Sequence, residues 1–497
     1  MERIGHYIGG KHVPGESGRR GPVFDPATGE QTHEVDFADP AELDTAVDAA
    51  KEAFWGWRAT SLSKRAEIMF TIRELLEARK TDVAKVLTAQ HGKVLSDAIG
   101  EVQRGLENVE YATAIPHLLK GGFSEQASTG VDVFEIRQPV GVVAGITPFN
   151  FPAMVPIWMC ANAIACGNTF ILKPSEKDPG PSLVLADLFA EAGLPDGVFN
   201  VIQGDKVAVD GILEHPDIKA VSFVGSTPIA KYIYTTGTAN GKRVQALGGA
   251  KNHMIVLPDA DVDMVADAAV SAGYGSSGER CMAISVMTNV GNIADTVVEA
   301  IADRIPKVKV GPGMDPESEM GPLITREHRD KVASYLDSGP AQGAHVVVDG
   351  REHDLYKEDK GFFLAPSLID DVTPEMDAYK DEIFGPVLSV TRLETYDQAV
   401  DLVNRSPYGN GVALFTRDGG AARQFVFEVE AGMVGINVPI PVPVAYYSFG
   451  GWKHSLFGDA HMYGPEGIRF YTRGKVVTQR WPDPATSKVD LGFPRTR

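Results

Sequence analysis

Hydrophobic residues recur along the chain at two different spacings, which predict two kinds of structure. Over residues 41–120 they fall three or four positions apart, as at Ala46, Ala50 and Phe54, which indicates amphipathic helices. From residue 140 onward, short apolar runs rich in β-branched residues alternate with helical stretches. We expect buried strands at 140–146, 168–174, 198–202 and 220–226, with a helix over 181–192. Strands that alternate with helices at this spacing indicate a parallel α/β sheet, which binds nucleotides at the carboxyl ends of its strands.

A second region of the same kind begins after residue 246. Its strand candidates are 254–257, 283–287, 346–348 and 387–390. Two other segments, 129–137 and 468–477, fit neither region because their polar and apolar residues alternate. We expect these two segments to form a hairpin whose polar face meets solvent or another subunit.

The composition narrows the class of protein. Three cysteines among 497 residues are too few for a disulfide framework, and their spacing matches no metal motif. The first residues lack the apolar core of a secretion signal, so we expect a reducing, cytoplasmic setting. The longest apolar stretch, 151–167, is interrupted by Pro152, Pro156 and Asn162, which favours a buried helix over a membrane span. A net charge of −19 disfavours nucleic acid and anionic membranes as partners.

Cys281 differs from the other two cysteines in its surroundings. Cys160 and Cys166 lie in the apolar stretch, where a free cysteine packs as a small hydrophobe. Cys281 ends the run Tyr274-Gly275-Ser276-Ser277-Gly278-Glu279-Arg280-Cys281, whose small residues let a ligand approach the backbone. Arg280 beside it would favour the thiolate, the form that attacks carbonyl groups. By itself, however, a cysteine in a loop is more often structural than catalytic.

The chain has no GxGxxG fingerprint directly after a predicted strand and no P-loop, so a dinucleotide site must be sought in other features. Lys173 and Glu176 follow a predicted strand, where they would either reach ribose hydroxyls or occupy a solvated loop. The segment Phe223–Thr227 ends the next strand with backbone amides and a hydroxyl at the start of a helix. Such an end suits a pyrophosphate, and it equally suits an ordinary helix N-cap.

Six motifs follow one another in a fixed order. They are Thr147-Pro148-Phe149-Asn150-Phe151-Pro152, Leu172-Lys173-Pro174-Ser175-Glu176, Phe223-Val224-Gly225-Ser226, Leu247-Gly248-Gly249, Gly278-Glu279-Arg280-Cys281 and Glu382-Ile383-Phe384-Gly385-Pro386. Together they span nearly the whole chain and resemble the NAD(P)-dependent aldehyde dehydrogenase superfamily. The resemblance implies the α/β fold of that family: a Rossmann-like NAD-binding domain, a catalytic α/β domain and a β-hairpin oligomerisation arm. The implied ranges are 1–121 and 141–246 for the first domain, 247–445 for the second, and 122–140 with 465–490 for the arm.

The same resemblance implies a role for each matched residue. Cys281 is the expected nucleophile, and the Asn150 side chain and the Cys281 backbone N–H are the expected oxyanion donors. The expected NAD contacts are Phe149, Lys173, Glu176, Gly225, Ser226, Glu382 and Phe384. Glu176 favours NAD over NADP because its carboxylate repels a 2′-phosphate. A homotetramer, built as a dimer of dimers, is the implied assembly.

One departure from the family pattern bears on how the product is released. Hydrolytic members carry a glutamate directly before Leu-Gly-Gly, where it activates water, but this chain carries Ala246. Alanine cannot act as a base, so a thioester on Cys281 should wait for a better nucleophile, such as the thiol of coenzyme A. Glu279 and His253 are possible substitute bases, although both could be surface or supporting residues.

Further details resemble the CoA-acylating methylmalonate-semialdehyde dehydrogenase branch of the superfamily. They include Gly249-Ala250-Lys251-Asn252-His253, Glu279-Arg280-Cys281-Met282-Ala283 and Gly450-Gly451-Trp452-Lys453. That branch oxidises semialdehydes that bear a carboxylate, which calls for a cation, and Arg280 and Arg104 are the candidates. The loop 438–449 is expected to line the substrate entrance.

The resemblance therefore predicts oxidation of malonate or methylmalonate semialdehyde with NAD and coenzyme A, giving acetyl-CoA or propionyl-CoA and carbon dioxide. The alternatives are a hydrolytic aldehyde dehydrogenase with another base, a non-catalytic member of the family, and a cysteine hydrolase. The last lacks a convincing His/Asn pair and leaves the six motifs unexplained.

Overall fold

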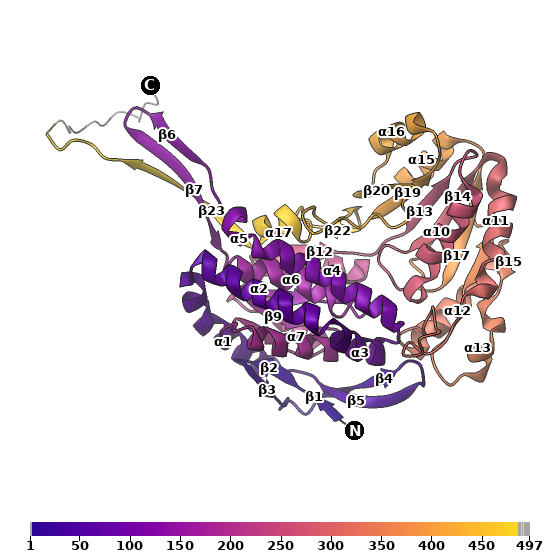
Figure 1. The fold of residues 1–497 in the computed structure, drawn as a ribbon, viewed down its shortest axis with the longest axis horizontal. Helices are drawn as coiled ribbons and strands as arrows, with labels where there is room; N and C mark the ends of the chain where they lie inside the picture. Colours follow the sequence, from indigo (N-terminus) through magenta and orange to yellow (C-terminus); the bar gives the residue numbers. More distant parts are fainter. Residues whose placement is uncertain (1, 486–488, 490, 492–497) are drawn as a thin grey trace.

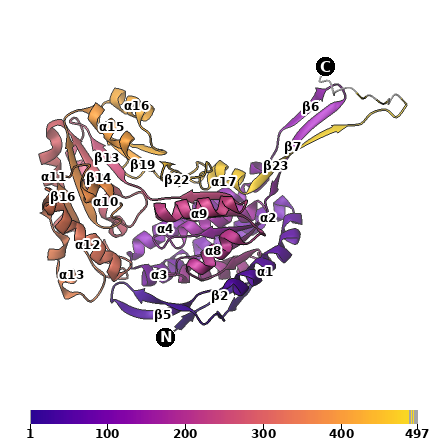
Figure 2. The ribbon, with the colours of Figure 1, turned by 180° about the vertical axis from the view of Figure 1, so that it is seen from behind.

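Two α/β sheets form the body of the molecule, and a narrow three-stranded arm projects from it (Figures 1 and 2). The computed structural model describes residues 2–485, 489 and 491. No helix among these residues is long and apolar enough to cross a bilayer.

The first sheet contains five parallel strands in the order β12, β11, β8, β9, β10. Their bounds are Arg243–Leu247, Ile218–Val224, Val142–Ile146, Thr169–Lys173 and Phe199–Val201. The antiparallel edge strands are β22 (Leu456–Phe457) on one side and the hairpin β2 (His6–Ile8) and β3 (Lys11–Val13) on the other. All four strands predicted in this region are present, which confirms the parallel sheet.

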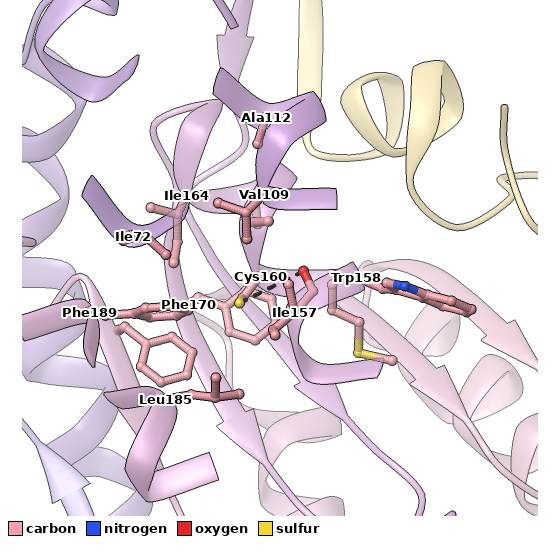
Figure 3. Packing of buried hydrophobic residues seen from close by; sticks show 14 of the residues in the cluster. Ile72, Val109, Ala112, Ile157, Trp158, Cys160, Ile164, Phe170, Leu185 and Phe189 are labelled. Carbon is pink, nitrogen blue, oxygen red and sulfur yellow. Dashed lines mark hydrogen bonds between the residues drawn. The ribbon is translucent and has the colours of Figure 1, made fainter. Parts of the chain in front are cut away.

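Helices cover both faces of the first sheet. They are α1 (Pro40–Ala59), α2 (Leu62–Ala78), α3 (Lys80–His91), α4 (Leu95–Thr113), α5 (Ile115–Leu118), α6 (Met154–Ala165), α7 (Gly180–Glu191), α8 (Lys206–Glu214) and α9 (Thr227–Ala239). Every residue of α6 is buried, as expected for a helix that apolar residues cover on all sides. Cys160 and Cys166 are fully buried in this core, and Figure 3 shows Cys160 among Ile157, Phe170 and Leu185.

The second sheet is built from residues between 252 and 436. Its strand order is β15 (His345–Val348), β16 (Ser367–Asp370), β17 (Val387–Leu393), β14 (Ile284–Val290), β13 (Asn252–Val256), β19 (Gly411–Phe415) and β20 (Met433–Ile436). All neighbours are parallel except β15 and β16. The main helices around it are α10 (Val262–Tyr274), α11 (Ala294–Ala302), α12 (Arg326–Ala341), α15 (Tyr396–Arg405) and α16 (Gly419–Glu428).

The arm consists of β6 (Phe123–Ser128), β7 (Val131–Pro139) and β23 (Thr472–Arg480). Strands β7 and β23 pair antiparallel along their full lengths, which confirms that the two alternating segments form a ribbon. The expected start of the second segment at Ile468 is wrong, because residues 468–470 belong to helix α17 (Gly464–Phe470). Ile468 and Phe470 are buried against the body rather than extended along the arm. Residues 486–488 and 490 of the implied arm lie outside the described residues.

A further small sheet was not predicted. It has the order β1 (Glu2–Ile4), β5 (Glu30–Asp36), β4 (Arg20–Asp25), and it packs beside α3. The domain boundaries given above stay a prediction.

Candidate active site

Cys281 follows a tight loop whose backbone is left-handed over three residues. Ser276, Ser277 and Gly278 have φ angles of 52°, 56° and 72°. A Cβ atom on Gly278 would lie 2.2 Å from the carbonyl oxygen of Gly385, so only glycine allows this close approach. The carbonyl of Cys281 accepts hydrogen bonds from the side-chain amides of Asn252 (3.0 Å) and Asn410 (3.2 Å). The backbone that carries the sulfur is therefore held by the first residue of β13 and by the residue just before β19.

Asn150 lies next to this loop, although 131 positions separate it from Cys281 in sequence. It belongs to the connection between β8 and α6, and its side chain is buried. Its Nδ2 donates to the carbonyl of Glu279 at 2.9 Å, two residues before the cysteine. An amide carries two N–H groups, so a second donor remains on Asn150 for a reacting oxygen.

A cavity of about 530 Å³ opens beside Cys281. Its apolar lining comes from α6 and the late loop, through Met154, Trp158, Ile440 and Val442. Loop 438–449 thus reaches the cavity, as the sequence predicted. Both candidate arginines, Arg104 and Arg280, also line it.

Each of these arginines already has a carboxylate partner. An Arg280 guanidinium nitrogen lies 2.5 Å from Asp97, and one of Arg104 lies 2.6 Å from Glu107. Arg104 also donates to the carbonyl of Pro443 at 2.9 Å. A guanidinium carries five N–H donors, so a substrate carboxylate could share either group with its present partner.

Arg280 favours the thiolate of Cys281, as predicted, but other groups around the sulfur outweigh it. Burial is the largest effect on Cys281, and with the charge of Glu382 it raises the pKa of the thiol to about 12. Arg280 lowers that pKa, but its effect is smaller than that of burial. In this state the sulfur carries its proton.

The proposed cofactor residues line up along the carboxyl ends of β9 and β11. Lys173 Nζ lies 3.2 Å from Glu176, and both side chains follow the end of β9. Gly225 and Ser226 lead into α9, where no side chain caps the first N–H groups. Those groups and the dipole of α9 suit a pyrophosphate. The Leu247-Gly248-Gly249 motif is tied to this end, because Gly249 donates its N–H to Thr227 Oγ1 at 2.9 Å.

Glu382 and Phe384 connect this edge to the second sheet. Glu382 accepts the backbone N–H of Ala250 at 2.9 Å, and burial raises the pKa of its carboxyl to about 7. Phe384 has a positive φ of 56°, and its ring meets Phe149 edge-on at 5.9 Å. A Cβ atom on Gly249 would lie 2.3 Å from Glu382, so the motif glycine leaves room for this carboxyl. These residues fit a dinucleotide that runs from Lys173 to Phe384.

None of the candidate bases lines the cavity beside Cys281. Ala246 is fully buried and belongs to an apolar cluster with Phe223. Glu279 is also fully buried, so a surface position is wrong for it, and burial raises its pKa to about 8. His253 is buried too, and its Nε2 lies 2.9 Å from the hydroxyl of Tyr379. Burial lowers the pKa of His253 to about 3.

Sequence reasoning assigned no role to Asp97, Glu101 and Trp158, which line the cavity, or to Lys93, which donates to the carbonyl of Asn150. Trp158 lies in the apolar stretch 151–167, where a buried helix was predicted; it packs against Tyr463 at 4.7 Å and also lines the cavity. The sequence offered one indication for Asp97 and Glu101, namely their position on the predicted amphipathic helix that became α4. Within the described part of the chain, no group of three or more His, Cys, Asp or Glu side chains could hold a metal ion.

Comparison with known proteins identifies the class to which this site belongs. The model of the aldehyde dehydrogenase family matches residues 12–477, and the chain belongs to that family. A malonate-semialdehyde dehydrogenase of Pseudomonas aeruginosa is 55% identical over 496 residues, covering 99% of this chain and 100% of that protein. Malonate-semialdehyde dehydrogenase 2 of Geobacillus kaustophilus is 48% identical over 481 residues, which are 97% of this chain and 99% of that protein.

Comparison with solved structures leads to the same family. A methylmalonate-semialdehyde dehydrogenase from Oceanimonas doudoroffii has a TM-score of 0.96 at 55% identity, covering 98% of this chain and 99% of that one. A protein from Sinorhizobium meliloti 1021, assigned as a methylmalonate-semialdehyde dehydrogenase and complexed with NAD, also has a TM-score of 0.96. It is 53% identical, with coverage of 98% and 99%. The family inferred from the six motifs, and its fold, are confirmed.

Proposed function

We propose that this protein is an NAD-dependent, CoA-acylating dehydrogenase of malonate or methylmalonate semialdehyde. The observation that carries the proposal is one cavity that holds Cys281, an adjacent Asn150 amide and two arginines. A carbonyl group and a carboxylate of one small molecule fit such a cavity. The names of the full-length relatives support the same substrate class.

The first step forms a bond between Cys281 Sγ and the aldehyde carbon after the thiol proton has left. The carbonyl electrons move to oxygen, where the Asn150 amide and the Cys281 backbone N–H donate hydrogen bonds to the oxyanion. NAD, when bound by Lys173, Glu176, Gly225, Ser226, Glu382 and the Phe149–Phe384 pair, supplies the hydride acceptor. As the oxyanion re-forms a carbonyl, hydride leaves the carbon and a thioester remains on Cys281.

The second half of the reaction releases the thioester to a thiol. With a β-carboxylate on the acyl group, carbon dioxide can leave, and the electron pair of the broken bond forms an enolate that takes a proton. Thiolysis then transfers the acyl group to the sulfur of coenzyme A and regenerates the free thiol of Cys281. The absence of a carboxylate at Ala246 supports thiolysis over hydrolysis.

Three finer points belong to the same proposal. Glu176 beside Lys173 supports NAD rather than NADP. The projecting arm, with exposed Phe123 and Val476, supports a homotetramer. Three free cysteines and no disulfide framework support a cytoplasmic location.

Product analysis tests the proposal. Purified protein is incubated with NAD and coenzyme A, and with either malonate or methylmalonate semialdehyde, and the CoA thioesters are identified by mass spectrometry. We expect acetyl-CoA from the first substrate and propionyl-CoA from the second. Release of the free acid as the main product would instead support a hydrolytic aldehyde dehydrogenase.

A further inference from the structure

A fully buried ion pair lies directly behind the proposed oxyanion donor. Lys93, just after α3, and Glu101, on α4, have side chains that are 0% and 1% exposed, and their charged atoms are 2.8 Å apart. Burying two charges costs free energy, and a pair in this position is weak evidence for stability alone. Its contacts indicate a more specific use.

The lysine holds the main chain of Asn150. Its Nζ donates to the Asn150 carbonyl oxygen at 2.6 Å and lies 4.4 Å from the centre of the Phe151 ring. The side chain of Asn150 is fixed at its other end by the carbonyl of Glu279. Asn150 is therefore held both through its backbone and through its amide, which leaves little freedom for the remaining N–H.

The glutamate holds the residues that follow. Glu101 Oε1 accepts the backbone N–H groups of Ala153 (2.9 Å) and Met154 (3.1 Å). Ala153 is the N-cap residue of α6 and has no side chain that can cap the helix. Glu101 thus serves as a cap supplied by another helix, and its negative charge suits the positive end of the α6 dipole.

We infer that Lys93 and Glu101 act together as a clamp that fixes residues 150–154, and that both are positioning residues for the Asn150 amide. The inference rests on the proposed function, in which that amide binds the oxyanion. Neither residue was predicted from the sequence to act at the site, although Glu101 lines the cavity. Because an error of about 1 Å in such a donor can slow a reaction roughly 100-fold, the clamp should matter for rate more than for cofactor affinity.

The test measures the rate constant of the NADH burst after mixing enzyme and NAD with malonate semialdehyde. Lys93→Met should slow the burst by about 10-fold to 100-fold, while the KM for NAD changes by less than about 2-fold. Lys93→Met also leaves Glu101 buried without its partner, so this variant loses stability as well. The double variant Lys93→Met/Glu101→Gln removes both charges and should recover the unfolding midpoint, but not the burst rate.

A double-mutant cycle with Asn150→Ala shows whether the clamp works through that residue. If it does, Lys93→Met should slow the burst by less than about 3-fold in the Asn150→Ala background, because coupled residues are not additive. Arg65→Met is the matched control, since Arg65 is also buried and donates to the carbonyl of Ala165 (2.8 Å) at the opposite end of α6. It should lower the unfolding midpoint and leave the burst rate unchanged.

Three results would overturn the clamp. The first is a double variant with the wild-type burst rate, and the second is a full slowing by Lys93→Met in the Asn150→Ala background. The third is a large loss with Glu101→Gln but none with Lys93→Met, which would make Glu101 a direct participant at the cavity wall. Failure of the proposed function is seen separately, as a wild-type enzyme that shows no burst.

Discussion

The sulfur of Cys281 carries its proton at neutral pH, because burial and the nearby Glu382 charge raise its pKa to about 12. A thiol is a poor nucleophile, and its reactivity follows the fraction present as thiolate. The free enzyme should thus be protected against alkylation and oxidation of this residue.

The rate of alkylation by iodoacetamide, measured without NAD, reports the fraction of Cys281 present as thiolate. Below a raised pKa the thiolate fraction grows with pH, so the rate should rise about tenfold per pH unit from pH 7 to 10 without a plateau. Labelling is followed by mass spectrometry, and Cys281→Ser serves as the control because Cys160 and Cys166 are fully buried. A rate that is already constant above pH 7 would contradict the raised pKa of the Cys281 thiol.

Arg280 and Arg104 are expected to recognise charge rather than the aldehyde group. Arg280→Gln should lower kcat/KM for malonate semialdehyde by about 10-fold to 100-fold, since it removes a charge-assisted hydrogen bond. Propanal has the same chain length but no carboxylate, and its kcat/KM should change by less than about 3-fold. Arg104→Gln is compared in the same assay. An equal loss of kcat/KM for both aldehydes would show that the substituted arginine does not bind the substrate carboxylate.

Individual residues of the site differ in how far sequence could predict them. Cys281 and Asn150 stand in recognisable motifs, and the structure brings them together. Lys93 could not be assigned, because its contact with Asn150 spans 57 positions and nothing local indicates the partner. The pKa of Cys281 could not be predicted from the sequence either, since it depends on burial and on Glu382, which lies about a hundred positions later, before the neighbouring strand β17.

At the scale of elements, two loops must pass very close to each other to build the site. The loop before Cys281 contacts the Phe384–Gly385 turn through Gly278, which has both a positive φ and no space for a side chain. The positions of the nucleophile and of the proposed nicotinamide contact are therefore linked.

Gly278→Ala should separate those loops and greatly reduce the NADH burst, because Cβ would lie 2.2 Å from a backbone oxygen. Gly241→Ala is a matched control, since Gly241 has a φ of 71° and no atom near its missing Cβ. Both variants should lose about 1 kcal/mol of stability from the backbone conformation, measured by urea unfolding, and Gly278→Ala should lose more. Equal stability and activity in the two variants would show that the close approach is unimportant.

Elements with strong patterns were predicted and those with weak patterns were not. The four predicted strands of the first sheet, out of its five parallel strands, are largely continuous apolar runs, as buried strands are. Strand β6 is exposed along nearly all its length, so no alternation of side chains revealed it. Residues 468–470 alternate like a strand, but Gly464-Pro465 starts a helix there and the core buries Ile468 and Phe470.

At the scale of the whole molecule, the arm stands away from the body (Figures 1 and 2). It exposes apolar side chains. Phe123, Val476 and Trp481 are 64%, 67% and 85% exposed. Such surface is expected to be covered by another subunit.

Val476→Glu should therefore shift the protein from a tetramer to smaller species, measured by light scattering after size-exclusion chromatography. Phe427→Glu on α16 is the control, because Phe427 is 91% exposed but lies off the arm. It should leave the mass unchanged. A tetramer that survives Val476→Glu, or that Phe427→Glu disrupts equally, would speak against assembly through this strand.

The arrangement of the two sheets could not be predicted from the sequence, although each sheet was. Their contact depends on single approaches such as Asn150 to the carbonyl of Glu279 and Gly249 to Glu382, which join segments more than a hundred positions apart. The site lies where these approaches occur, so its geometry depends on the whole fold.

The central claim is that Cys281 forms a thioester that coenzyme A, and not water, removes. It is tested most directly by NADH formation from malonate semialdehyde when coenzyme A is left out. The account predicts a burst of about one equivalent of NADH per Cys281, followed by very slow turnover, with steady turnover restored when coenzyme A is added. Steady NADH formation and release of free acid without coenzyme A would contradict it.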